Sequence, residues 1–443
     1  MTEIITLLSC IEPIIGKKIQ KQLLIIIKAM LTMNGRITML GLSRWSEKGG
    51  SYSTINRFFH SEIDWLKVNW YFIKKHMPKR GVFLLAGDEV VVTKSGKKTH
   101  GIGRFFSSIQ NQVTTGISFL NLSIISVNSG KAWSIFMGQI TNKNVKGCSK
   151  GKEKKKSKKS KSKSKKEKNK AGRKEGSKNK DKKVIELSPY LNFVKKSISR
   201  VLAVIKKIIP ITYFLFDGAF GNNNALQMVL QTGLHLISKL RRDSALYFEY
   251  KGDNKKQKYG DKIDYGNLPE EYLVEMKLEK SIITKIYQMK MRHKLFADYL
   301  NIVIIVKINI KNGRKAHVIL FSSDLDLDYE KLIHYYSLRF QIEFIFRDAK
   351  QHWGLEDFMN VKEKAVHNFA NLSTFMVNFS YGIRREFGNE KMSIINLKAR
   401  FHGVKYLNEI IKLLPQKPDA ILMNTLYQKI TAIGAIDEEK RVA

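Results

Sequence analysis

The sequence has very little cysteine, with only Cys10 and Cys148 among 443 residues. Two cysteines cannot build a disulfide scaffold or a zinc site made of several thiolates, and nothing points to an oxidising compartment. The ten histidines show no metal-ligand spacing such as His-Glu-x-x-His, so a zinc site of that kind is unsupported as well. Because 43% of the residues are hydrophobic, the chain can bury a core without such cross-links.

Long uninterrupted apolar runs are also missing. The N-terminal stretch 4–33 is apolar, but charged side chains interrupt it, namely Glu12, Lys17, Lys18, Lys21 and Lys28. It is too charged to span a bilayer, and no small-residue cleavage site follows an apolar segment as in a signal peptide. The sequence therefore predicts a protein of the cytoplasm, without membrane contact and with access to DNA.

Acidic residues are few, with 39 Asp and Glu against 79 Lys and Arg, which gives a formal net charge of +40. The low-complexity Lys/Ser run 150–183 holds 19 basic and 4 acidic residues, so it carries +15 and leaves 40 − 15 = +25 on the rest. A polyanion is the expected partner of such a chain. We interpret the run as a disordered insert that touches phosphates without reading sequence, with a solvated run of no function as an equal alternative.

The hydrophobic pattern predicts an α/β fold with several added regions. The first region reads as basic helices, which suit a DNA-binding bundle or, equally, a cap on the next domain. Buried strand runs then alternate with helices, as in an α/β sheet. The predicted boundaries are 1–78 for the helical N-terminal DNA-binding region, 79–243 for the first part of the core with a Lys-rich insert at 149–183, 244–320 for a β-rich insertion, 321–390 for the second part of the core, and 391–443 for a C-terminal helical region.

Two carboxylates stand at corresponding places in this pattern. Asp88 and Asp217 each follow an apolar strand run and precede a loop, which is where open α/β sheets place ligand sites. An Asp after a run of buried residues needs a metal, a base or solvent around it. Either residue alone would be unremarkable, because an Asp at a strand end often only caps a turn.

A third element is a long helix predicted from Asp328 to about Gln351, with Asp326 or Asp328 as its N-cap. At 100° per residue, its polar residues Tyr336, Arg339, Glu343 and Lys350 share one face. Much of the helix must be buried because it also carries considerable apolar bulk, so this polar stripe is expected to face a cleft. An ordinary surface ion pair between Arg339 and Glu343 is the alternative.

The pattern Tyr-x2-Arg-x3-Glu-x6-Lys resembles the signature of IS-four-type transposases of bacterial insertion sequences, the YREK subgroup of DDE transposases, at all four positions. Gly-Asp88-Glu-Val-Val-Val-Thr-Lys and Phe-Asp217-Gly-Ala-Phe-Gly-Asn resemble the first and second Asp motifs of that family. The resemblance covers roughly residues 35–380. The spacings of 217 − 88 = 129 and 343 − 217 = 126 residues suit a family with a β insertion between the second Asp and the Glu.

This resemblance implies an RNase H-like core of the retroviral integrase superfamily, in which Asp88, Asp217 and Glu343 are catalytic. They would hold two divalent cations, Mg²⁺ with Mn²⁺ as a substitute, and oxygen ligands of this kind suit Mg²⁺. The implied activity is cut-and-paste transposition, in which DNA strands are cleaved and transferred with water and then a 3′-hydroxyl as nucleophile. The implied location is the bacterial cytoplasm, in association with the nucleoid.

The same resemblance implies that Tyr336, Arg339 and Lys350 contact phosphates of the transposon end. Arg241 and Arg242, after the third strand run, are further candidates for phosphate contacts, with surface charge as an equal alternative. The expected partner is double-stranded DNA, both inverted-repeat ends and target, bound by a homodimer. Two other functions stay open: another RNase H-like nuclease, or a non-catalytic basic protein that coats nucleic acid.

Overall fold

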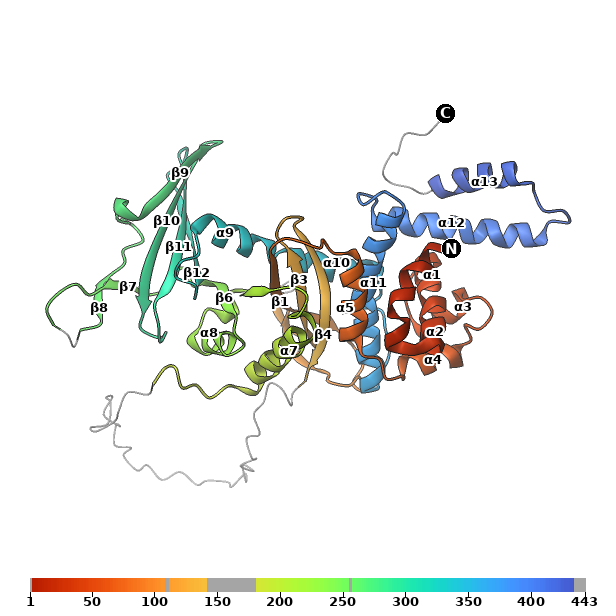
Figure 1. The fold of residues 1–443 in the computed structure, drawn as a ribbon, viewed down its shortest axis with the longest axis horizontal. Helices are drawn as coiled ribbons and strands as arrows, with labels where there is room; N and C mark the ends of the chain where they lie inside the picture. Colours follow the sequence, from red (N-terminus) through yellow and green to blue (C-terminus); the bar gives the residue numbers. More distant parts are fainter. Residues whose placement is uncertain (1, 108–110, 142–180, 255–256, 434–443) are drawn as a thin grey trace, which may run out of the picture.

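The structure, a computed structural model, describes residues 2–107, 111–141, 181–254 and 257–433 (Figure 1). All but the last three residues of the Lys-rich insert predicted at 149–183 lie outside the described residues.

The centre of the fold is a mixed β-sheet. Three antiparallel strands, β4 (Lys131–Ile140), β3 (Gln112–Ser126) and β1 (Phe83–Thr93), are followed by β5 (Ile211–Leu215), parallel to β1, and β6 (His235–Leu240), parallel to β5. The short β2 (Gly103–Ser107) pairs with β3. Three antiparallel strands followed by two parallel ones are the arrangement of an RNase H-like core. The predicted α/β fold class is therefore confirmed.

Helices cover both faces of this sheet, and the side chains of β1 alternate between the two faces. Leu84 and Ala86 join one apolar cluster with α9, α10 and α11, whereas Phe83 and Leu85 join a second cluster with α7 and α8. A strand buried on both faces reads as an uninterrupted apolar run, which explains the run that precedes Asp88. Here the helices are α7 (Pro189–Ile205), α8 (Asn223–Leu230), α9 (Tyr329–Leu338), α10 (Gln341–His352) and α11 (Glu363–Glu386).

The β-rich segment continues the sheet. β12 (Lys315–Ser322) pairs antiparallel with β6, and β11 (Leu300–Asn309), β10 (Ile282–His293) and β9 (Leu273–Glu279) follow in order. The small strands β7 (Leu246–Glu249) and β8 (Tyr259–Lys262) complete the segment at the left of Figure 1. β11 and β12 form a hairpin, and Gly313 in its turn has a φ of 66°, a conformation that glycine adopts without strain.

Helices gather at the other end of the molecule (Figure 1). The N-terminal helices α1, α4 and α5 pack on the long buried helix α11, α2 and α3 pack on α4, and α12 packs on α2 and α13. Their bounds are Thr2–Leu8 for α1, Glu12–Thr32 for α2, Met39–Trp45 for α3, Tyr52–Phe59 for α4, Trp65–His76 for α5, Ile394–Leu413 for α12 and Ala420–Ala432 for α13.

The prediction of one long helix from Asp328 to Gln351 is wrong, although Asp328 does cap its start. The segment forms two helices, α9 and α10, that separate at Arg339 and Phe340. At this step the backbone bonds span three residues, as from Glu343 N to Phe340 O at 3.0 Å, so the chain is wound more tightly than an α-helix. Periodicity could not reveal this, because both halves keep a helical pattern.

His76, the last residue of α5, is buried with an exposed fraction of 4%. Burial foremost, and then the positive charges of Lys75 and Arg385, lower the pKa of His76 to about 4 from its ordinary 6.5. Above pH 6.5 the ring is neutral in both the folded and the unfolded chain, so it adds no pH dependence there. As the pH falls from 6.5 toward 4, only the unfolded chain takes up the proton, and the free energy of unfolding decreases.

We therefore expect His76→Phe, which keeps an aromatic ring beside Phe72, to remove part of the acid sensitivity of the fold. Between about pH 7.5 and about pH 5, the wild type should lose about 2 kcal/mol more of unfolding free energy than the variant. Urea denaturation of both proteins at the two pH values measures this difference. Equal losses would show that His76 is protonated in the folded protein.

Candidate active site

The prediction that Asp88 ends its strand and precedes a loop is wrong, because β1 continues to Thr93. Asp88 lies two residues beyond Ala86 and so points to the sheet face that α10 and α11 cover. Its side chain is 18% exposed, and its Oδ1 accepts a hydrogen bond of 2.8 Å from the Glu89 amide. Burial raises the pKa of Asp88, the charges of Asp217 and Glu343 raise it further, and the Arg339 guanidinium opposes them. The charges of Asp217 and Glu343 thus both act on the Asp88 carboxyl.

Asp217 follows the neighbouring strand β5 and lies level with Asp88 along the strand direction. Ala86 of β1 pairs with Leu215 of β5, and each Asp follows its paired residue by two positions. Asp217 begins a short 3₁₀ turn, where its Oδ1 accepts a hydrogen bond of 3.0 Å from Ala219 N. The Ser238 hydroxyl of β6 donates to the Asp217 carbonyl at 2.6 Å, which fixes the backbone there.

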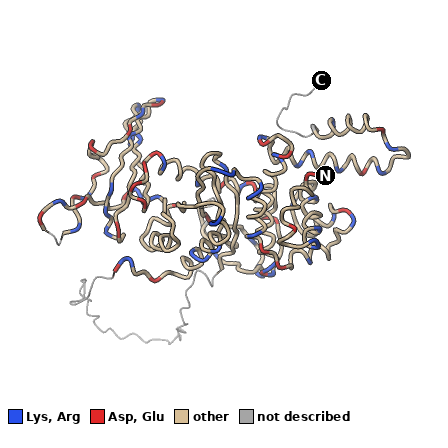
Figure 2. Tube along the Cα trace, in the orientation of Figure 1, with Lys and Arg blue, Asp and Glu red and all other residues tan. Residues whose placement is uncertain are grey.

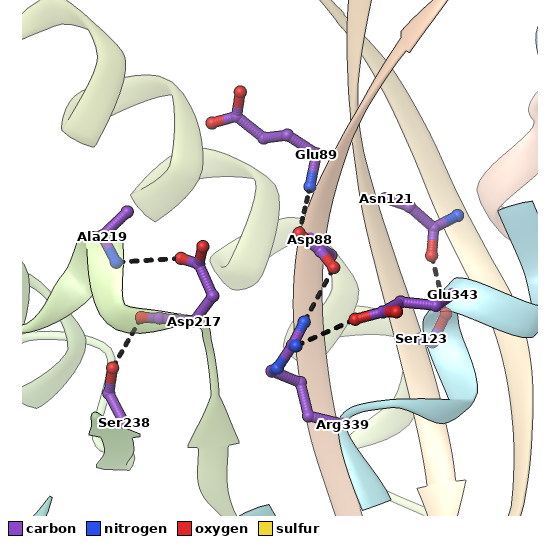
Figure 3. Close-up of polar contacts among 9 residues, drawn as sticks. All are labelled: Asp88, Glu89, Asn121, Ser123, Asp217, Ala219, Ser238, Arg339 and Glu343. Carbon is purple, nitrogen blue, oxygen red and sulfur yellow. Dashed lines mark hydrogen bonds and ion pairs between the residues drawn. The ribbon is translucent and has the colours of Figure 1, made fainter. Parts of the chain in front are cut away.

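Glu343 comes from the first turn of α10 and meets Asp88 through Arg339 (Figure 3). Arg339 Nη1 lies 2.8 Å from Asp88 Oδ2, and its Nη2 lies 3.0 Å from Glu343 Oε1. The pair of Arg339 with Glu343 that the sequence suggested does form, but it is not an ordinary surface pair. The Arg339 side chain is only 15% exposed, and the same guanidinium binds a second carboxylate that is 251 residues away.

The other residues of the polar stripe take different places. Tyr336 is half-buried beside the acidic group, and burial first, then the charges of Asp217 and Asp88, raises its pKa. Lys350 turns toward β1, where its Nζ donates to Val91 O at 3.1 Å, and it pairs with Glu356 Oε1 at 2.8 Å. It therefore ties α10 to β1 and holds the helix against the strand that carries Asp88.

Arg241 and Arg242 are exposed and lie directly after the end of β6. Neither arginine takes part in the described hydrogen bonds that join Asp88, Arg339 and Glu343. Because β5 and β6 are parallel, the two arginines lie at the same edge of the sheet as Asp217, which follows β5.

Glu89 points to the opposite face from Asp88, as the alternation of an extended strand predicts. The residue is partly exposed, but the surrounding protein desolvates its carboxyl, and its Oε1 accepts a hydrogen bond from the hydroxyl of Tyr190 in α7. Burial first, and then the charges of Asp88 and Asp217, raises the pKa of Glu89, whereas the Tyr190 bond lowers it. Nothing in the sequence links Tyr190 to Glu89, since 101 residues separate them.

The three acidic residues fit a divalent cation in their chemistry, because Mg²⁺ and Mn²⁺ prefer carboxylate oxygens. As the side chains stand, no three Asp, Glu, His or Cys residues in the described ranges lie close enough together to hold a metal ion. The Arg339 guanidinium lies between two of these carboxylates and supplies the positive charge there.

Basic residues are spread over every region of the described chain, from the N-terminal helices to the β-rich segment (Figure 2). The excess of positive charge is thus not confined to the Lys-rich run. Of the helices in the described ranges, none is both long enough and apolar enough to cross a membrane.

Comparison with known proteins gives one family match. A family model described as DDE superfamily endonuclease matches residues 10–290, which is well over half of the chain. No curated protein matches the chain. Among solved structures, the piggyBac transposase synaptic complex with hairpin DNA is similar at 9% identity and a TM-score of 0.35, over 92% of this chain and 74% of that chain.

Proposed function

The chain belongs to the DDE superfamily endonucleases, and from this premise we propose that it is a transposase that cleaves DNA strands and joins them to a new site. One observation carries the proposal. Asp88 lies within β1, Asp217 follows the adjacent strand β5, and Glu343 lies on α10; Arg339 binds Asp88 and Glu343, and the charge of Asp217 acts on Asp88 (Figure 3). The family match ends at residue 290 and does not include Glu343. We assign Glu343 to the site because it contacts Arg339, which also binds Asp88.

Asp88, Asp217 and Glu343 would hold two divalent cations, Mg²⁺ or Mn²⁺. Bound there, such ions activate the attacking oxygen and stabilise charge on the leaving oxygen of a phosphodiester. The chain itself fixes the carboxylates: Ser238 and Ala219 hold the Asp217 turn, and Lys350 holds α10 against β1. Rigid placement of this kind is what phosphoryl transfer requires from a protein.

For the DNA, we propose Tyr336 and Arg339 as phosphate contacts next to the scissile bond, with Arg241 and Arg242 further along the same edge. The planar fork of Arg339 matches two phosphate oxygens. Lys350 is engaged with Val91 and Glu356, so we assign it a positioning role first. With Tyr336, Arg339, Glu343 and Lys350 all present, we propose the YREK subgroup of bacterial insertion sequences, and a homodimer that pairs two DNA ends.

Asp217→Asn tests this function. We expect the wild-type protein, with Mg²⁺, to cut a plasmid that carries the coding region with its flanking DNA at the borders of the element, and EDTA to stop it. The variant keeps the size of the side chain but removes a metal-binding charge, so cleavage should fall by about 10³-fold or more. Gel analysis of nicked and linear products measures both rates.

Asp326→Asn is the matched control, because Asp326 is 89% exposed and contacts Lys290 instead of the acidic group. It should cleave like the wild type, and all three proteins should bind the same DNA. Cleavage that persists in EDTA, or at an unchanged rate in Asp217→Asn, would contradict the proposed function.

A further inference from the structure

Arg339 links two carboxylates of the proposed active site that are far apart in the sequence. It stands at the step between α9 and α10, and its two terminal nitrogens reach Asp88 at 2.8 Å and Glu343 at 3.0 Å. The side chains of Arg339 and Asp88 are 15% and 18% exposed, so water screens their attraction only in part. This contact therefore has a larger effect on the carboxylates than a surface ion pair would have.

The guanidinium occupies oxygens that a cation would need. Asp88 Oδ2 and Glu343 Oε1 both accept from it, while Asp88 Oδ1 accepts from the Glu89 amide. Arginine does not lose its proton in a protein, so these oxygens become free only when the side chain moves. A divalent ion must therefore compete with a positive charge that is already in place.

A phosphate group is the anion that can draw this side chain away. Its oxygens match the planar guanidinium in the same two-point geometry as the carboxylates do. Each DNA strand supplies one such group at every nucleotide. Glu343 is 43% exposed, so its end of the contact is open to an incoming strand.

We propose that Arg339 couples DNA binding to metal binding. In the free protein it pairs with Asp88 and Glu343, offsets part of their negative charge and keeps the affinity for divalent cations low. When DNA binds, the guanidinium transfers to a phosphate oxygen and frees both carboxylates. This inference rests on the proposed function, since it takes the carboxylates as the metal-binding groups. By linkage, DNA raises the metal affinity and metal raises the DNA affinity by the same factor.

The test is Mn²⁺ binding by the full chain, followed through the electron paramagnetic resonance signal of the free ion. Without DNA, Arg339→Gln should bind Mn²⁺ about tenfold more tightly than the wild type, because the competing charge is gone. A short duplex DNA should raise the affinity of the wild type by a similar factor and that of Arg339→Gln by less than about twofold. The Asp217→Asn protein, with and without the same duplex, corrects for ions bound elsewhere.

Arg347→Gln is the matched control, since Arg347 lies on the same helix, is 53% exposed and pairs with Asp348 at 2.8 Å. It should bind Mn²⁺ like the wild type. A variant that had merely lost structure would bind less metal, so a gain of affinity separates the proposed role from a structural one. If circular dichroism shows that Arg339→Gln does not fold, Arg339→Lys, with a shorter reach and no fork, should give an intermediate affinity.

Equal Mn²⁺ affinities of wild type and Arg339→Gln without DNA would overturn the inference. The proposed function would still stand if the wild type cleaved DNA with Mg²⁺. In contrast, no binding above the Asp217→Asn baseline, together with no cleavage by the wild type, would remove the proposed function itself.

Discussion

Glu343→Gln is expected to slow Mg²⁺-dependent DNA cleavage by about 10³-fold or more. The amide is as large as the carboxylate, and its oxygen can still accept from Arg339. What it loses is the negative charge that would bind a cation on the side of Asp88 that faces α10. The fold should persist, because Glu343 is 43% exposed and lies outside the apolar clusters.

The rate should be measured on the plasmid that carries the element with its flanking DNA, with DNA binding followed in parallel. Glu330→Gln is the matched control: it makes the same change on α9, at an exposed position in the first turn of that helix. It should leave both cleavage and binding unchanged. If Glu343→Gln cleaved as fast as Glu330→Gln, Glu343 would not be the third metal-binding carboxylate, and that residue would lie outside α10.

The strand runs before the two Asp residues could be predicted from sequence because most of their side chains are apolar. A mainly apolar run before an acidic residue is visible without any tertiary information, as in the first half of β1 and in β5. The third predicted strand run, which precedes Arg241, is β6. The apolar runs thus predict the strands, and the acidic residues after the runs predict the site.

The contacts within the site could not be predicted, because they join residues that are far apart in the chain. Periodicity placed Arg339 and Glu343 on one helix face, and they do meet at 3.0 Å. It gave no sign that the same guanidinium reaches Asp88, or that Tyr190 binds Glu89. Such pairs depend on how α10 and α7 cross the two faces of β1, and this is decided by packing rather than by local sequence.

The break between α9 and α10 was missed for a related reason. The polar stripe and the apolar residues keep a helical spacing across residues 339 and 340, so the pattern predicts a continuous helix. The tighter step at this point rests on backbone bonds over three residues, such as Ile342 N to Arg339 O at 3.1 Å. No residue type in the segment requires that winding.

Asn368→Ala should destabilise the fold by about 3 kcal/mol or more, because three polar groups lose their partner in a buried place. Asn368 is 1% exposed in the second turn of α11. Its Oδ1 accepts from Trp65 Nε1 at 2.8 Å, and its Nδ2 donates to the carbonyls of Phe59 and Ser61, each at 2.9 Å. One side chain therefore ties the turn between α4 and α5 to the helix that packs on the sheet.

Urea denaturation, followed by circular dichroism, measures the loss, and Asn424→Ala is the matched control. Asn424 is exposed on α13, and alanine favours a helix there, so the control should be neutral or slightly stabilising. If the N-terminal helices unfolded separately, Asn368→Ala would give a second, earlier transition instead of one shifted transition. A single shifted transition would show that the N-terminal helices and the sheet unfold together, because α11 packs against both. A change as small as that in Asn424→Ala would mean that water replaces all three hydrogen bonds, which contradicts the burial of this side chain.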